Sequence, residues 1–141
     1  MLKNNAVKRW SAVHRVLFRS TGGRLGKRLV DNDILLLTTT GRKTGQSHTV
    51  PLLYLTDNQR FVVIASYGGR EYYPAWYLNL TDDPAVTARL VGRTLKLVAR
   101  TANADERRRW WPRIVEAYDG YRLYQSRTER EIPVVLLEPP I

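Results

Sequence analysis

From residue 34 onward the sequence is a series of short apolar runs, each long enough for one β-strand and each bounded by Gly, Asn, Asp or Pro. Runs of this length that are rich in β-branched residues predict strands rather than helices. They span residues 34–40, 47–55, 61–66, 86–92, 94–100 and 132–138. Turn signals at Asp57-Asn58 and Gly92-Arg93 indicate hairpins, so consecutive strands are expected to pair antiparallel. Because a flat sheet of this size would expose its edges, we expect a mainly β (α+β) domain of about six strands that close, or nearly close, into a small barrel.

Two helical segments interrupt these strands. The first, residues 74–80, is short and ends at a Thr-Asp-Asp-Pro sequence. The second, residues 104–118, precedes the last strand and has Asn103 as a plausible N-cap, with Glu106 three residues later to complete a capping box. Pro112 is expected to bend or restart this helix, because proline lacks the N–H that a helix interior requires.

The first 30 residues differ in composition from the rest. They contain eight lysines and arginines and no acidic residue. Apolar residues recur at helical spacing on one face: Val7, Trp10, Val13, Leu17 and Phe18. We therefore divide the chain into a basic amphipathic extension (residues 1–30) and a barrel domain (residues 31–141). Such a helix can pack its apolar stripe on the domain or lie on an anionic membrane surface, and the sequence leaves both readings open.

The charge of the whole chain limits its partners. With 141 residues, a net charge of +10 and a pI near 10.3, this single domain is expected to bind an acidic partner: nucleic acid, an anionic membrane, or a phosphorylated or carboxylated small molecule. The absence of cysteine excludes disulfides and thiolate chemistry. His14 and His48 are too few for a histidine metal site, so no metal is expected. With no signal-peptide pattern and no apolar run of membrane-spanning length, we expect a cytoplasmic protein.

The sequence GRKTGQ, residues 41–46, places two adjacent cations and a hydroxyl in a turn between two strands. Arg42 can hold a phosphate with two parallel hydrogen bonds, and Lys43 adds a point charge. Thr44 and the backbone amides near Gly45 can complete the shell of donors around its oxygens. The alternative is a solvated basic turn. The spacing is not that of a P-loop, which joins a strand to a helix.

Two further stretches suggest a pocket. In residues 65–80, the pair Gly68-Gly69 follows a buried strand and allows close approach of a backbone or a flat ligand. In residues 117–128, three tyrosines recur every third residue and share a face on a helical or 3₁₀ segment. They suit a pocket for a planar, apolar substrate with oxygens to be hydrogen-bonded. Both groups of aromatic residues are alternatively core or interface.

Together, TTTGRKTG, VPLLYL, ASYGG, PAWYLNL, the tyrosine-spaced segment and REIPVVLLEP, in this order, resemble the deazaflavin-dependent nitroreductase family, the class A flavin/deazaflavin oxidoreductases. The resemblance extends from about Thr21 to Pro139. It implies an FMN-binding-like split β-barrel and a reductase that uses reduced coenzyme F420, a deazaflavin with a phosphate and a polyglutamate tail. The implied acceptors of hydride are quinones, nitroaromatic or nitroimidazole compounds, and unsaturated carbonyl compounds.

The resemblance also implies which residues form the site. The implied cofactor-binding residues are Arg42, Lys43, Thr44, Gly45, His48, Pro51, Ala65, Ser66, Gly68, Gly69, Ala75, Trp76 and Asn79. The implied catalytic residues are Ser66, Tyr118, Tyr121 and Tyr124, which would hydrogen-bond the acceptor, with the final proton from Tyr121, Tyr124 or water. The chain departs from the family pattern at Tyr67, in place of a lysine, and at His48, in place of an arginine.

Alternative functions follow from the same residues. FMN carries one phosphate that Arg42 and Lys43 can hold equally well, so an FMN-binding split-barrel reductase is the first alternative. A nucleic-acid-binding module follows from the charge alone, but the sequence contains no recognition motif for it, which makes nucleic acid the weaker alternative. The expected assembly is a monomer or a homodimer. The additional partner considered is an anionic membrane, in peripheral contact with residues 1–30.

Overall fold

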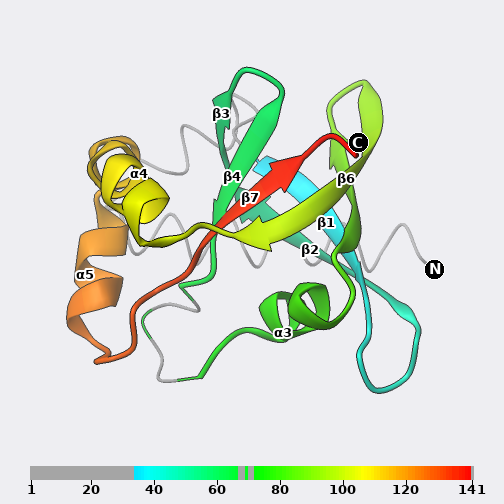
Figure 1. Cartoon of the computed structure of the whole chain (residues 1–141), viewed down its shortest axis with the longest axis horizontal. Coiled ribbons are helices and arrows are strands. Elements are labelled where there is room, and N and C mark those ends of the chain that lie inside the picture. The colour runs from blue at the N-terminus through cyan, green and yellow to red at the C-terminus, as the bar shows by residue number, and fades with distance from the viewer. Residues whose placement is uncertain (1–33, 67–68, 70–71, 141) are drawn as a thin grey trace.

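Seven strands and three helices make up the described part of the chain, which covers residues 34–66, 69 and 72–140 of the computed structural model (Figure 1). The amphipathic helix expected within residues 1–30 lies outside these described residues. The division of the chain at residue 30 therefore stays a prediction.

All the strands belong to one antiparallel sheet. They are β1 (Ile34–Thr40), β2 (Ser47–Leu53), β3 (Leu55–Asp57), β4 (Arg60–Ile64), β5 (Ala85–Leu90), β6 (Arg93–Thr101) and β7 (Val134–Glu138). Their order in the sheet is β2-β1-β5-β6-β7-β4-β3, and every neighbouring pair is antiparallel. The predicted mainly β, antiparallel architecture is confirmed. The run predicted as one strand over residues 47–55 is divided at Tyr54, and this division gives seven strands instead of six.

The expectation of closure into a barrel is wrong, because the sheet is open between β2 and β3. These two strands are its edges, and no ladder of hydrogen bonds joins them within the described ranges. The reason lies in their connection, which is Tyr54 alone. One bent stretch of chain pairs with β1 before the bend and with β4 after it, so the two edges meet only at that corner. The sheet therefore curls but stays split along the remaining length of its edges.

Both hairpins predicted from turn signals are present. In the β3–β4 hairpin, Asn58 has a φ of 57° and lies between the paired residues Asp57 and Arg60. In the β5–β6 hairpin, Gly92 has a φ of 80° and directly precedes β6. A positive φ in a two-residue connection matches the right-handed twist of the flanking strands, which explains Asn and Gly at these positions.

The two faces of the sheet bury separate apolar clusters. Helix α3 (Ala75–Asp82) packs against one face through Trp76 and Leu80, in what we call the α3 cluster. Helices α4 (Ala104–Ala117) and α5 (Gly120–Ser126) pack against the other face, in what we call the α4–α5 cluster. Residues alternate between the clusters along β4, with Val63 in the first and Val62 in the second, as the two-residue period of a strand requires. Figure 1 shows α4 and α5 together beside β4 and β7, with α3 apart from them.

Helix α4 begins as the sequence predicts. Glu106 N donates to Asn103 Oδ1 at 2.9 Å, and Asn103 N donates to Glu106 Oε1 at 3.0 Å, which forms the expected capping box. The helix continues through Pro112 to Ala117, so the expected restart does not occur. Pro112 is exposed, and water can therefore bind the helix carbonyl that proline leaves without a partner. One further helix, α5, follows before the last strand.

Candidate functional site

The turn between β1 and β2 is a closed loop with exposed cations at its tip. Gly41 N donates to Gln46 O at 2.7 Å, and Gly45 N donates to Gly41 O at 2.8 Å. Gly45 has a φ of 73°, in the left-handed region that favours glycine. Arg42, Lys43 and Thr44 lie exposed within this loop. Two backbone hydrogen bonds thus close the turn, while its charged side chains are exposed to solvent.

A buried asparagine on α3 holds the turn in place. Asn79 is 4% exposed, and its Oδ1 accepts hydrogen bonds from both N and Nη1 of Arg42, each at 3.2 Å. Its Nδ2 donates to Thr39 Oγ1 at 3.2 Å. Asn79 therefore ties the end of β1 to the turn and fixes the guanidinium of Arg42 at the border of α3. This arrangement pre-organises Arg42 to meet an anion.

A hollow of about 560 Å³ opens between this turn, β2 and the start of α3, and we call it the α3 hollow. It is lined by Gly41, Arg42, Lys43, Thr44, His48, Thr49, Val50, Pro51, Ala75, Trp76 and Asn79. Its rim carries the cations of the turn, and its walls include the apolar side chains of Val50, Pro51 and Trp76. Eight of the predicted cofactor-binding residues meet here; Gly45 stands beside them on the turn, and Ala65, Ser66 and Gly69 lie at the end of β4.

The chemistry of the α3 hollow fits a flat, anionic cofactor. Its volume of about 560 Å³ is within the range of small-molecule sites, and apolar walls suit a planar ring system. The cationic rim suits phosphate and carboxylate groups. A Cβ added at Gly41 would lie 2.8 Å from His48 Nε2, so the absence of a side chain at Gly41 lets His48 pack against the turn. These features suit F420 and FMN alike.

The end of β4 forms a second group of predicted residues. Ala65 and Ser66 are buried directly after the strand, and Gly69 N donates to Ser66 O at 2.9 Å. A Cβ added at Gly69 would lie 2.4 Å from Tyr124 O, so only glycine lets this segment approach α5 so closely. Gly68, predicted to bind the cofactor, lies outside the described residues.

The three predicted tyrosines form a row against α4 and the sheet. Successive rings meet edge to face, with centroids 6.1 Å apart for Tyr118 and Tyr121 and 5.9 Å for Tyr121 and Tyr124. Tyr118 and Tyr121 are buried, and Tyr118 Oη donates to Tyr54 O at 3.2 Å. Burial raises the pKa of the Tyr121 hydroxyl far above its usual value, so it keeps its proton at neutral pH. The row belongs to the α4–α5 cluster, and the α3 hollow lies at the other cluster.

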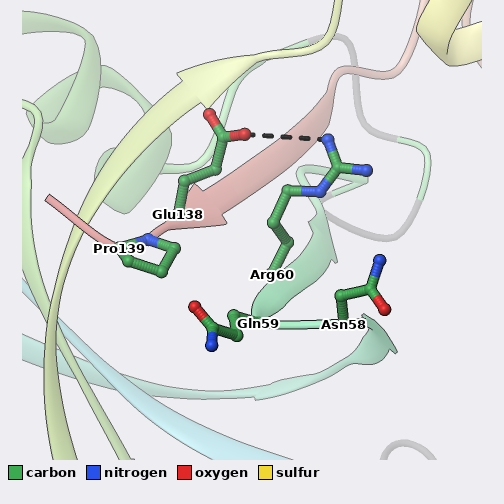
Figure 2. Close-up of a pocket in the computed structure, with 5 residues that line it drawn as sticks. All are labelled: Asn58, Gln59, Arg60, Glu138 and Pro139. Atoms are coloured by element: carbon green, nitrogen blue, oxygen red, sulfur yellow. Dashed lines mark ion pairs between the residues drawn. The ribbon is translucent and has the colours of Figure 1, made fainter. Parts of the chain in front are cut away.

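A second hollow, of about 590 Å³, lies at the β3–β4 hairpin and the end of β7. Figure 2 shows Arg60 and Glu138 pointing toward one another across it, with an Nη1–Oε2 distance of 3.7 Å. Arg60 also pairs with Asp57 at 2.8 Å, and Glu138 pairs with Arg100 at 2.6 Å. Because these charges neutralise one another, and none of the predicted site residues lines it, this hollow is not a candidate site.

Some lining residues were not expected from the sequence. Gly41, Thr49 and Val50 contribute to the α3 hollow. Their neighbours His48 and Pro51 were expected there, and an account of both faces of β2 would have included the intervening pair. No helix within the described ranges is long and apolar enough to cross a membrane. The same residues contain no group of three metal-binding side chains.

The fold and the hollow suit a protein that binds a flat, anionic cofactor, and comparison with known proteins gives the family. The family model for F420H(2)-dependent quinone reductase matches residues 10–139. The chain belongs to this family, and the predicted resemblance and oxidoreductase class are confirmed.

The individual relatives agree with this assignment over most of the chain. The F420H(2)-dependent quinone reductase Rv1261c of Mycobacterium tuberculosis is 36% identical over 129 residues, which cover 89% of this chain and 87% of that protein. A solved structure of an F420-H2 dependent reductase (FDR-A) has a TM-score of 0.70 and 39% identity, covering 75% of this chain and 94% of its own. A second, described as a domain-swapped dimer, has a TM-score of 0.71 and 35% identity, covering 96% and 99%.

Proposed function

We propose that this protein transfers hydride from reduced coenzyme F420 to a quinone, with the cofactor bound in the α3 hollow. The observation that carries the proposal is the pairing of Arg42 with the buried side chain of Asn79, at the cationic rim of an apolar hollow. When bound, the reduced deazaflavin supplies the hydride. The protein then has to bind, orient and shield the reactants.

Charged and polar residues of the hollow bind the anionic groups of the cofactor, and apolar residues face its ring. Arg42 and Lys43 hold the phosphate and the carboxylates of the tail, and Thr44 adds a hydroxyl donor. The apolar walls at Pro51 and Trp76 would exclude water from one side of a bound planar ring. The net charge of +10 draws the anionic cofactor toward the protein.

We propose that the ring of the cofactor reaches from the α3 hollow to the end of β4, where Ala65 and Ser66 are predicted to bind it. The acceptor then lies against that ring where the end of β4 meets α5, because hydride transfer requires the two to be in contact. Ser66 lies at this strand end, and Gly69 brings the segment against Tyr124. Tyr124 is only half-buried, so its hydroxyl is better suited to reach an acceptor oxygen than the buried hydroxyl of Tyr121. Tyr124 or water supplies the final proton. Tyr121 packs edge to face on Tyr124, and Tyr118 packs edge to face on Tyr121, so the two buried rings hold Tyr124 in position.

The finer features of the assignment are proposals as well. Nitroaromatic and unsaturated carbonyl compounds are further acceptors of the same hydride. A homodimer is supported by the similar structure described as a domain-swapped dimer. Contact with an anionic membrane would involve residues 1–30, which lie outside the described residues, and this contact stays a prediction.

The deciding experiment measures oxidation of F420H2 by menadione under anaerobic conditions, with the purified protein and with Arg42→Ala. We expect turnover that depends on the protein and a raised KM for F420H2 in the variant. A parallel reaction with reduced FMN tests the alternative cofactor. Turnover with FMN alone, or FMN retained through purification, would favour the flavin enzyme. No turnover with either cofactor would overturn the proposal.

A further inference from the structure

One arginine connects three segments that lie far apart in the sequence. Arg130 stands between α5 and β7, and its Nη1 donates to Ala65 O at 3.3 Å while its Nη2 donates to Ser66 O at 2.8 Å. Its guanidinium carbon lies 4.8 Å from the centroid of the Tyr73 ring, just before α3. A single side chain thus contacts both the end of β4 and Tyr73, two residues before α3.

The segment that carries Arg130 is itself held rigidly by a glutamine on α5. Gln125 Nε2 donates to Arg130 O at 2.8 Å, and its Oε1 accepts from Ile132 N at 2.9 Å. The same Oε1 accepts from Arg107 Nη2 at 3.0 Å, and Arg107 Nε donates to Ile132 O at 3.0 Å. Because both ends of the Gln125 amide are engaged, the backbone around Arg130 is fixed to α4 and α5 without any ligand.

Among these contacts, the hydrogen bond to Ser66 bears on the reaction, because Ser66 is one of the residues expected to bond the acceptor. Ser66 O accepts from Arg130 Nη2 and also from Gly69 N at 2.9 Å, so two donors fix this carbonyl. A hydrogen bond from a guanidinium is roughly twice as strong as one between neutral groups. Arg130 therefore sets the position of the buried Ser66 and the orientation of Tyr73, which is 41% exposed.

We propose that Arg130 is a positioning residue for the acceptor half of the reaction. It holds Ser66 and the Tyr73 ring at a fixed separation, so that a planar acceptor is placed for hydride transfer. The inference rests on the proposed function. Neither Arg130 nor Ser66 lines the α3 hollow. The effect of Arg130 on the acceptor can therefore be measured separately from the binding of the cofactor's anionic groups at Arg42. Only a planar guanidinium can bond two carbonyls and cover a ring at once, and lysine cannot replace it fully.

The test compares Arg130→Ala and Arg130→Lys with Arg113→Ala. Arg113 is a matched control, because its guanidinium also covers an aromatic ring, 4.2 Å from the Trp110 centroid, on α4. We expect kcat with menadione to fall about 10- to 100-fold in Arg130→Ala and less in Arg130→Lys, since misplacement by about 1 Å costs on the order of 100-fold. The Kd for F420, measured by tryptophan quenching without turnover, should rise less than kcat falls, because the two carbonyls that Arg130 bonds, at Ala65 and Ser66, lie outside the hollow.

The possible results separate this inference from the proposed function. A folded Arg130→Ala protein with wild-type kcat would overturn the inference, and so would a Kd for F420 that rises as much as kcat falls. If Arg130→Ala does not fold, Arg130→Lys decides, because full kcat in that variant would contradict a need for the guanidinium. A wild-type protein without F420H2 oxidation would overturn the proposed function, and this inference with it, before any variant is measured.

Discussion

Two regions that the sequence presents as equally functional, the turn at residues 41–46 and the tyrosine row at residues 118–124, differ sharply in their surroundings. The side chains of the turn are exposed, and their main anchor is one buried amide, Asn79. In the tyrosine row, each ring packs edge to face on the next, and two of the three are buried.

The difference shows that burial, more than residue type, decides what a polar or aromatic motif does. The turn keeps its cations exposed, because two hydrogen bonds within its backbone and the contacts of Arg42 with Asn79 hold it in shape. Most of the ring surface of the tyrosine row is buried in the core, where apolar burial stabilises the fold. Substitutions of the exposed side chains of the turn should therefore change affinity with little effect on stability. Substitutions of the buried tyrosines should change stability with little effect on affinity.

The largest expected effect is on stability, from Tyr121→Ala. Removing this buried ring leaves a cavity between two other tyrosines, and we expect a loss of about 3–5 kcal/mol in the free energy of unfolding in urea. Tyr72→Ala is the control, because Tyr72 is 77% exposed and its loss should change stability by less than about 0.5 kcal/mol. Equal effects of the two substitutions would mean that the row is not part of the core.

Asn79→Ala is expected to affect both quantities, because Asn79 links the turn to the fold. Loss of its bonds to Arg42 and Thr39 should cost about 1–3 kcal/mol of unfolding free energy. The Kd for F420 should also rise, by about 3- to 10-fold, as Arg42 loses its fixed position. Asn103→Ala removes a capping asparagine that does not line the hollow and should cost about 1 kcal/mol. An equal rise of Kd in both variants would refute the link.

Comparing alanine substitutions at two glycines distinguishes the effect of backbone strain on stability from its effect on F420 binding. Gly45 and Gly92 have φ angles of 73° and 80°, and an added Cβ at either would meet no atom within 4 Å. Alanine at each should therefore cost about 1–2 kcal/mol, because both sites demand left-handed backbone. Only Gly45→Ala should weaken F420 binding, measured beside the thermal unfolding of both proteins. Weaker binding in Gly92→Ala would show that the effect is not specific to the turn.

The smallest effect is expected at the capping box, away from both regions. The hydrogen bonds from Arg100 lower the pKa of the Glu106 carboxyl from 4.5 to about 2. Because the folded pKa is lower than the unfolded one, the stabilisation is present above pH 4.5 and is lost as the pH falls toward 2. Glu106→Gln should cost about 1 kcal/mol or less at pH 7, since Arg100 is partly exposed, and the difference in urea midpoint should shrink at pH 3. A constant difference would contradict the ion pair.

Local signals were sufficient to predict many of the elements. Strand β1 begins and ends at the predicted residues, and the cap of α4 forms as its sequence indicates. Each of these depends on residues within a few positions of one another. The bend at Tyr54 was not predicted, because it depends on β2 and β3 pairing with different strands across the sheet.

The site was predicted in its parts but not in its connections. Arg42 and Asn79 were both expected to bind the cofactor, but their mutual hydrogen bonds join residues 37 positions apart. The contact of Arg130 with Ala65 spans 65 positions and has no local signature. The tyrosine spacing predicted a shared face correctly, but spacing alone does not say which layer of the fold that face meets.

We propose the turn at residues 41–46 as the anion clamp of the cofactor site. Its most direct test is the Kd for F420, from tryptophan quenching, of wild type, Arg42→Ala/Lys43→Ala and the control Arg89→Ala/Lys96→Ala. The control removes two exposed cations from β5 and β6, so both variants have the same net charge. We expect the turn variant to bind about 100-fold more weakly, as for two lost charge-assisted hydrogen bonds, and the control to bind as wild type does. Equal weakening in both would mean that charge alone, and not the turn, attracts the cofactor.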